Sequence, residues 1–235
     1  MVKISLDKKR KTDFIALAVH KLKTPMSSVK LSLEMLLEGD FGELNNEQKR
    51  IIERAYQRNN TLIYLANDLL NLAKVEANHY YNLTSVNFEN LIKSIVDFEQ
   101  EEIKKKEVKV NIKWPKTKLP KIILDKEKMF LAIQNIFDNA VKYSKNGGEI
   151  NISFSSNDKN LELKIEDYGI GILENDKEKL FTEFFRGENA KELDPMGSGL
   201  GLYIAKIIIK DHNGKIWFES KEDKGSAFFV NLPIK

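Results

Sequence analysis

Apolar residues in the first third of the chain recur every three or four positions, the spacing of amphipathic helices. Over residues 4–37 they form one stripe and predict one long helix: Ile15, Ala18, Leu22, Met26, Val29, Leu33 and Leu36. A polar tip at 39–48 follows, in which Gly39 is suited to end the helix. A second helix is predicted over about 46–77, with an apolar face formed by Ile52, Ala55, Leu62, Ala66, Leu69 and Ala73.

Two long helices joined by a short turn predict an antiparallel hairpin. A lone hairpin leaves its apolar stripes half covered, and the pairing of two copies into a four-helix bundle covers them. The pattern therefore predicts a homodimer.

The pattern changes after about residue 82. A connecting segment and a helix are predicted over 83–106, followed by strands at 108–114 and 121–125, a helix at 126–143, strands at 149–155 and 161–169, a helix at 204–212, and a hairpin formed by 216–220 and 227–233. Because helices and strands mix without a regular alternation, we expect an α+β sandwich. The predicted domains are therefore a helical hairpin, 1–82, and a sandwich, 83–235.

Composition excludes several classes of function. The charge is nearly balanced, 38 Lys and Arg against 35 Asp and Glu, which argues against a nucleic-acid-binding face. The chain has no cysteine, which excludes disulfides and thiolate metal sites. No apolar run approaches the roughly 20 residues that span a bilayer. We expect a cytoplasmic protein, with a membrane anchor only if a longer parent chain supplies it.

Residues suited to a nucleotide begin at QNIFDNAVKYS, 134–144. Asn135, Asn139 and Tyr143 share one helical face, and Asn139 offers an uncharged oxygen to a hard cation that also takes phosphate oxygens. A solvated helix face shows the same polarity, so this segment alone leaves both interpretations open.

The second such segment is EDYGIGI, 166–172, where Asp167 ends a strand before Gly169 and Gly171. The backbone can approach a flat ligand there while the carboxylate accepts from an exocyclic amine. Ordinary turns use the same pattern.

A third segment, GSGLGL at 197–202, opens a helix, and glycine amides at a helix N-terminus can bind phosphate. The fourth, KGSAFF at 224–229, is by itself ordinary hairpin chemistry. Residues 180–197 predict a short aromatic helix and a flexible lid, with Arg186 placed to reach a terminal phosphate. No G-x-x-x-x-G-K-[ST] motif is present, which disfavours a Walker-type NTPase.

In this order the segments resemble the boxes of sensor histidine kinases. QNIFDNAVKY resembles the N box, DYGIG the G1 box, LFTEFFR the F box and GSGLGL the G2 box, and HKLKTP at 20–25 resembles the phosphoacceptor box. The resemblance covers nearly the whole chain. It implies a dimerisation and histidine-phosphotransfer hairpin followed by a Bergerat-type ATP-binding domain.

The resemblance also implies a role for individual residues. Asn139 would be the Mg²⁺ ligand beside Asn135, Asp167 would bind the adenine amine of ATP, and Arg186 would meet its γ-phosphate. The remaining nucleotide contacts would be Lys142, Tyr143, Gly169, Gly171, Gly197, Gly199, Leu200 and Gly201.

His20 is the phosphoacceptor that the resemblance implies. It lies two residues before Leu22 of the apolar stripe, about 200° around a helix, and we expect it to face solvent. Pro25 cannot donate to the carbonyl of Lys21, so we expect a bend beside His20. By the resemblance, Thr24 would position a water that hydrolyses an aspartyl phosphate on a partner. A harmless kink beside a surface histidine is the alternative.

Lys21 departs from the family pattern, which usually has Glu or Asp after the histidine. An acid there accepts the Nδ1 proton and orients the imidazole, whereas an ammonium only donates. Lys21 disfavours a second positive charge on the imidazole, and it can attract a triphosphate. The other histidines, His79 and His212, are expected to be structural or exposed.

Three functions are compatible with these residues. The first is a homodimeric histidine kinase that phosphorylates His20 from Mg-ATP, passes the phosphoryl group to an aspartate of a response-regulator receiver domain, and can act as that regulator's phosphatase. The second is a dimeric ATP-binding scaffold with weak or absent autokinase activity because of Lys21. The third is an ATPase of the chaperone or topoisomerase type, against which the histidine-bearing hairpin argues.

Overall fold

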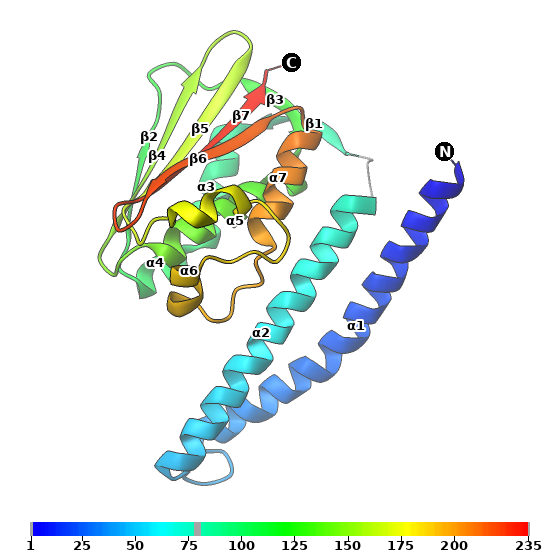
Figure 1. Cartoon of the computed structure of the whole chain (residues 1–235), viewed down its shortest axis with the longest axis vertical. Coiled ribbons are helices and arrows are strands. Elements are labelled where there is room, and N and C mark those ends of the chain that lie inside the picture. The colour runs from blue at the N-terminus through cyan, green and yellow to red at the C-terminus, as the bar shows by residue number, and fades with distance from the viewer. Residues whose placement is uncertain (1, 78–80, 235) are drawn as a thin grey trace. The chain divides into compact units, whose positions relative to one another are not determined.

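The computed structural model describes residues 2–77 and 81–234. It divides into two compact units, Met1–Asn78 with Pro195–Leu200, and His79–Asp194 with Gly201–Lys235 (Figure 1). The first contains a helical hairpin and the second a mixed sheet with helices, which confirms the predicted fold class. Within the described residues, no helix has the length and apolar character needed to cross a membrane.

The hairpin consists of α1 (Val2–Glu38) and α2 (Asn46–Ala77). Gly39 ends α1 with a φ of +87°, as predicted for a C-terminal cap. Asn45 and Gln48 start α2 through two reciprocal bonds: the Gln48 amide donates to Asn45 Oδ1 at 2.9 Å, and the Asn45 amide donates to Gln48 Oε1 at 3.0 Å.

The apolar stripe of α1 is wider than one partner helix can cover. Val19 is 5% exposed, whereas Leu22 and Val29 are 58% and 48% exposed. Part of the stripe is therefore exposed in one copy, as expected for a hairpin that has no second copy beside it. His20, next to Val19, is exposed as expected.

The second unit is built on a five-stranded sheet in the order β2-β4-β5-β7-β6 (Figure 1). Its strands are β2 (Lys109–Lys113), β4 (Glu149–Ser156), β5 (Asn160–Asp167), β6 (Lys215–Lys221) and β7 (Gly225–Pro233). Only β2 and β4 pair in parallel. Alternate residues of β5 are buried, and Asp167 continues the series of Leu161, Leu163 and Ile165.

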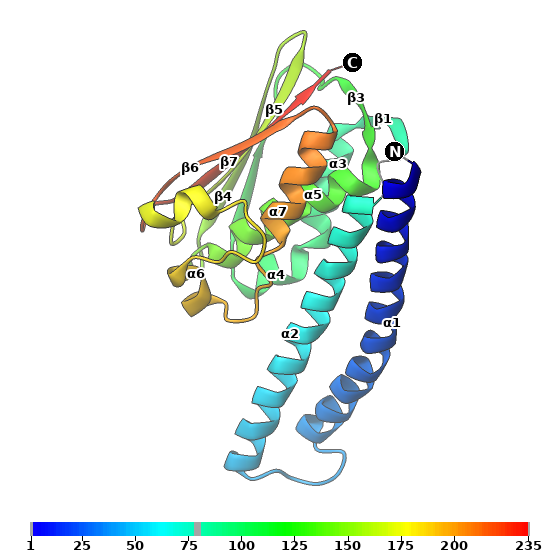
Figure 2. The same ribbon diagram turned by 45° about the vertical axis from the view of Figure 1, so that its right-hand side comes forward.

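Helices cover one face of this sheet (Figure 2). They are α3 (Phe88–Phe98), α5 (Lys126–Tyr143) and α7 (Gly201–Asp211), with the short α4 (Gln100–Lys105) after α3. The predicted helix before residue 106 is thus two helices, broken at Glu99. His212 is buried at the end of α7, where its Nε2 accepts from the Asp125 amide at 3.0 Å, so this histidine is structural. His79 lies outside the described residues.

Two predicted elements differ in the structure. The segment expected to be a connection forms β1 (Leu83–Asn87), which pairs with β3 (Lys121–Asp125) in a separate antiparallel sheet. The aromatic segment expected to be helical forms turns between the 3₁₀ helix η1 (Glu174–Lys179) and α6 (Glu188–Leu193). Phe184 there has a φ of +59°, which an α-helix does not accommodate.

Candidate functional site

The buried carboxylate of Asp167 is the chemical centre of the second unit. It is 5% exposed, and its Oδ1 accepts from the amide of Gly169 at 2.9 Å. Burial raises the pKa of Asp167 to about 6, although the backbone amides of Gly169 and Ser226 favour the charged form. A desolvated carboxylate at the end of a strand is suited to accept a hydrogen bond from one donor group of a flat ligand.

The turn after Asp167 has no room for a side chain at either of its two glycines. A Cβ on Gly169 would lie 1.9 Å from the carbonyl oxygen of Tyr143, and a Cβ on Gly171 would lie 2.1 Å from that of Lys221. The amide of Ile170 also donates to the Tyr143 carbonyl at 3.2 Å. The DYGIG turn, 167–171, which we call the G1-like turn, is therefore fixed directly against the last turn of α5.

Asn135 and Asn139 lie four residues apart on α5, and both are partly buried. The Nδ2 of Asn135 is buried and has no hydrogen-bond partner in the described protein. A Cβ added to Gly201, the first residue of α7, would lie 3.1 Å from the Oδ1 of Asn135. A buried donor without an acceptor, beside a helix N-terminus, fits an anionic ligand at this point.

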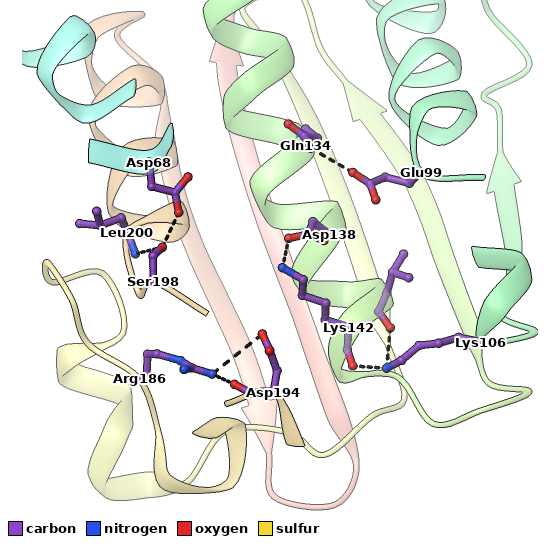
Figure 3. Close-up of polar contacts among 11 residues, drawn as sticks. Asp68, Glu99, Lys106, Gln134, Asp138, Lys142, Arg186, Asp194, Ser198 and Leu200 are labelled. Atoms are coloured by element: carbon purple, nitrogen blue, oxygen red, sulfur yellow. Dashed lines mark hydrogen bonds and ion pairs between the residues drawn. The ribbon is translucent and has the colours of Figure 1, made fainter. Parts of the chain in front are cut away.

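Lys142 and Tyr143 end α5. The Nζ of Lys142 lies 2.7 Å from Asp138 Oδ2. Burial acts to lower the pKa of Lys142, but the Asp138 carboxylate outweighs it and raises that pKa (Figure 3). Burial and the Asp194 carboxylate raise the pKa of the Tyr143 phenol, with Arg186 and Lys142 acting in the opposite direction. Two cations and one anion thus lie near the Tyr143 hydroxyl.

Arg186 is held by the segment that follows it. Its Nη2 donates to the carbonyls of Ala190, at 3.3 Å, and Asp194, and lies 3.9 Å from the Asp194 carboxylate (Figure 3). The Arg186 side chain is 12% exposed. The lid-like segment therefore contains both this cation and an anion that pairs with it.

The GSGLGL segment is divided between the two units. Gly197, Gly199 and Leu200 belong to 195–200, which groups with the hairpin, whereas Gly201 belongs to the second unit. Within 195–200, Ser198 donates to a carboxylate oxygen of Asp68 and accepts from the Leu200 amide at 3.1 Å (Figure 3). The role of Gly197, Gly199 and Leu200 at the phosphates stays a prediction.

On the hairpin, His20 and Lys21 are exposed, and among the described residues no ion pair or hydrogen bond holds the His20 imidazole. The Thr24 hydroxyl donates to the His20 carbonyl at 3.4 Å, and Lys23 Nζ donates to Asn67 Oδ1 of α2 at 3.2 Å. The exposed imidazole can approach a phosphoryl donor, and no side chain in the described part of the chain orients it.

Sequence reasoning missed several residues that shape the second unit. Asn189 Nδ2 donates to the Gly171 carbonyl at 3.1 Å, and the Ile172 amide donates to Ser220 Oγ at 2.9 Å. Lys106 binds carbonyls at the end of α5. No periodicity or motif marks such contacts, because they join residues far apart in the chain.

Two families match the chain. Residues 10–78 match the His Kinase A (phospho-acceptor) domain, and residues 124–235 match the family described as Histidine kinase-, DNA gyrase B-, and HSP90-like ATPase. The first includes the exposed histidine, and the second includes Asp167 and the turn packed against α5.

Curated relatives match along the whole chain. The sensor histidine kinase WalK of Bacillus subtilis is 33% identical over 98% of this chain and 38% of its own length. The sensor-like histidine kinase SenX3 of Mycobacterium tuberculosis is 30% identical over 94% of this chain and 53% of its own. The chain thus spans about two fifths to one half of the length of these relatives.

Solved structures share the fold. Full-length ShkA in complex with AMPPNP aligns with a TM-score of 0.69 at 22% identity, over 94% of this chain and 45% of that one. The histidine kinase AdeS of Acinetobacter baumannii aligns with a TM-score of 0.63 at 21% identity, over 92% of this chain and 98% of that one.

Proposed function

Because this chain belongs to the sensor histidine kinase family, with a phospho-acceptor domain followed by a histidine kinase-type ATPase domain, we propose that it phosphorylates His20 from ATP. The observation that carries the proposal is the buried Asp167 carboxylate, held in a glycine turn against the end of α5. The exposed His20 provides the acceptor.

The reaction is an in-line displacement at phosphorus. The lone pair of an imidazole nitrogen forms a bond to the γ-phosphorus, the bond to the bridging oxygen of ADP breaks, and the leaving ADP takes the electron pair. Asp167 accepts from the adenine amine, and Lys142 and Arg186 neutralise phosphate charge. The protein acts mainly through positioning and electrostatics, as in phosphoryl transfer generally.

Magnesium fits this site as a companion of the nucleotide. Asn139 would hold it through its amide oxygen, with phosphate oxygens as the other ligands, and the unpaired Asn135 amide beside it would donate to the bound anion. When bound, Mg²⁺ neutralises negative charge on the β- and γ-phosphates. The AMPPNP complex of the fold relative ShkA supports an ATP-type ligand.

We further propose that the phosphoryl group passes to an aspartate of a response-regulator receiver domain, and that Thr24 serves a phosphatase reaction.

The hairpin would work as a homodimer, because Leu22 and Val29 of α1 are exposed in one copy. ATP and receiver domains are cytoplasmic, so this part of the protein would act in the cytoplasm. The proposed domain division remains 1–82 and 83–235.

A second candidate, the dimeric ATP-binding scaffold, is favoured by one observation. Lys21 is exposed beside His20, and no described acid orients the imidazole. This candidate predicts nucleotide binding without phosphohistidine.

The test is incubation of the purified chain with γ-labelled ATP and Mg²⁺. A kinase acquires acid-labile, base-stable label that a His20→Ala variant lacks. Nucleotide binding without label in the wild type selects the scaffold, and steady ATP turnover that persists in His20→Ala selects the chaperone- or topoisomerase-like ATPase. Label that persists in His20→Ala contradicts the acceptor assignment.

A further inference from the structure

A lysine outside every nucleotide motif holds the end of α5. Lys106 follows α4, and its Nζ donates to the carbonyls of Val141 at 3.2 Å and Ser144 at 3.2 Å. It also donates to the carbonyl of Lys142 (Figure 3). These are carbonyls of the last turn, which carry the partial negative charge of a helix C-terminus. The Lys106 ammonium provides a hydrogen-bond donor to three of these carbonyls and offsets their partial negative charge.

The backbone around Lys106 fixes where its side chain begins. Glu107 adopts a φ of +56°, and its amide donates to the Lys104 carbonyl at 3.1 Å, while the Val108 amide donates to the Ile103 carbonyl at 3.0 Å. This double closure is a Schellman-type end of α4. The Lys106 carbonyl in turn accepts from the Gly147 amide at 2.9 Å, so Lys106 contacts the segment after α5 through both its backbone and its side chain.

The end of α5 is bound from a second direction by the G1-like turn. The carbonyl between those that Lys106 binds, that of Tyr143, accepts from the Ile170 amide at 3.2 Å. Ile170 lies three residues after Asp167. Lys106 and the G1-like turn therefore share one rigid support, the turn of α5 that carries Lys142 and Tyr143.

We propose that Lys106 is a positioning residue for the nucleotide site, acting through the last turn of α5. Its ammonium donates to backbone carbonyls, so in this role it supports the site without serving as a nucleotide ligand itself. It keeps Lys142 and Tyr143 in the orientation in which they contact the nucleotide. Because the Tyr143 carbonyl accepts from the Ile170 amide, Lys106 also holds the turn after Asp167 in place. This inference rests on the proposed function, since it gives Lys106 a supporting role in the same nucleotide site.

The test compares Lys106→Met with Lys105→Met by isothermal titration with Mg-ADP and by autophosphorylation kinetics. Methionine keeps the apolar stem and removes the ammonium. Lys105 is the matched control because its side chain is 74% exposed and its Nζ lies 3.5 Å from Glu102 of its own helix. We expect Lys106→Met to raise the Kd for Mg-ADP and the KM for ATP about tenfold, with kcat at saturating ATP within about twofold and Lys105→Met unchanged.

Two further measurements separate positioning from general stability. Lys106→Arg should restore most of the affinity, because a guanidinium can still donate to the carbonyls. Amide hydrogen exchange at Ile170 should accelerate in Lys106→Met, while exchange in the distant pair β1 and β3 stays unchanged. If Lys106→Met fails to fold, Lys106→Gln, which keeps one amide donor, takes its place.

An unchanged Kd in the folded variant, or equal acceleration of exchange throughout the second unit, would overturn the inference. Failure of the proposed function gives a different result, because the wild type itself would then either not bind Mg-ADP or, as the scaffold candidate predicts, bind it without phosphorylating His20. The titrations and the autophosphorylation assay of the wild type therefore distinguish the two failures.

Discussion

Asp167 shows how one buried group combines recognition with pH dependence. Burial raises its pKa to about 6 from an ordinary value of 3.8. The carboxylate that accepts from an adenine amine is the ionised form. In the unliganded protein, the protonated carboxyl favours folding below pH 3.8, and this contribution is lost as the pH rises through about 6.

Nucleotide affinity should therefore fall in acid. Between pH 7 and pH 5 we expect the Kd for ADP to rise, approaching about tenfold per pH unit below pH 6. The measurement is fluorescence titration of wild type and Asp167→Asn at each pH, so that titration of the ligand's own phosphates cancels. If both proteins show the same pH dependence, Asp167 is not the group that reads the ligand.

Lys21 departs from the usual pattern of the phosphoacceptor box, in which Glu or Asp follows the histidine. An acid at this position can accept the Nδ1 proton of His20, which a lysine cannot do. Lys21→Glu should raise the initial rate of His20 phosphorylation by about a hundredfold, the lower end of the range of positioned acid–base assistance, with no change in the Kd for ADP. An equal rate would show that an acid here gives no assistance, and a lower rate would show that the lysine itself serves the reaction. Lys23→Glu is the control.

At the scale of the element, the sequence predicted most helices and strands because their apolar periodicity is strong. It missed β1, whose residues Leu83, Thr84 and Ser85 are exposed and show no alternation. It also missed the turns of the F-box segment, since Phe184 and its aromatic neighbours favour a helix by apolar content alone. Lys106 could not be found, because its partners on α5 lie 35 to 38 residues away.

The end of α4 offers a stability test that is separate from function. Glu107 has a φ of +56°, a conformation that costs a non-glycine residue about 1 kcal/mol or more. Glu107→Gly should therefore raise the free energy of unfolding by about 1 kcal/mol, measured by urea denaturation. Glu101→Gly, within α4, should lower it by about the same amount. A destabilising Glu107→Gly would show that the glutamate side chain has a contact of its own.

For the whole molecule, the hairpin provides the argument for self-association. Leu22 and Val29 lie seven residues apart, on one side of α1, and both are exposed in one copy. Burial of such side chains contributes roughly 1.5–3 kcal/mol each. The periodicity identified this apolar stripe, but it could not show which of its residues face α2 and which face a second copy.

Charge in this stripe should weaken the dimer. Leu22→Glu with Val29→Glu should raise the dimer dissociation constant at least about a hundredfold, measured by sedimentation equilibrium. Leu31 is 59% exposed and lies nine residues from Leu22, about 180° around the helix, so Leu31→Glu is the control. Equal effects of the two changes would show that the stripe is not the contact surface.

The central claim is that ATP bound beside Asp167 supplies a phosphoryl group to His20. Its most direct test is to locate that group by tandem mass spectrometry at neutral pH after incubation of the wild type with Mg-ATP. We predict modification of the peptide that contains His20, on the imidazole, and its absence from Asp167→Asn. A phosphoryl group on a serine or threonine, or on His20 in equal amount without the Asp167 carboxylate, would contradict the account.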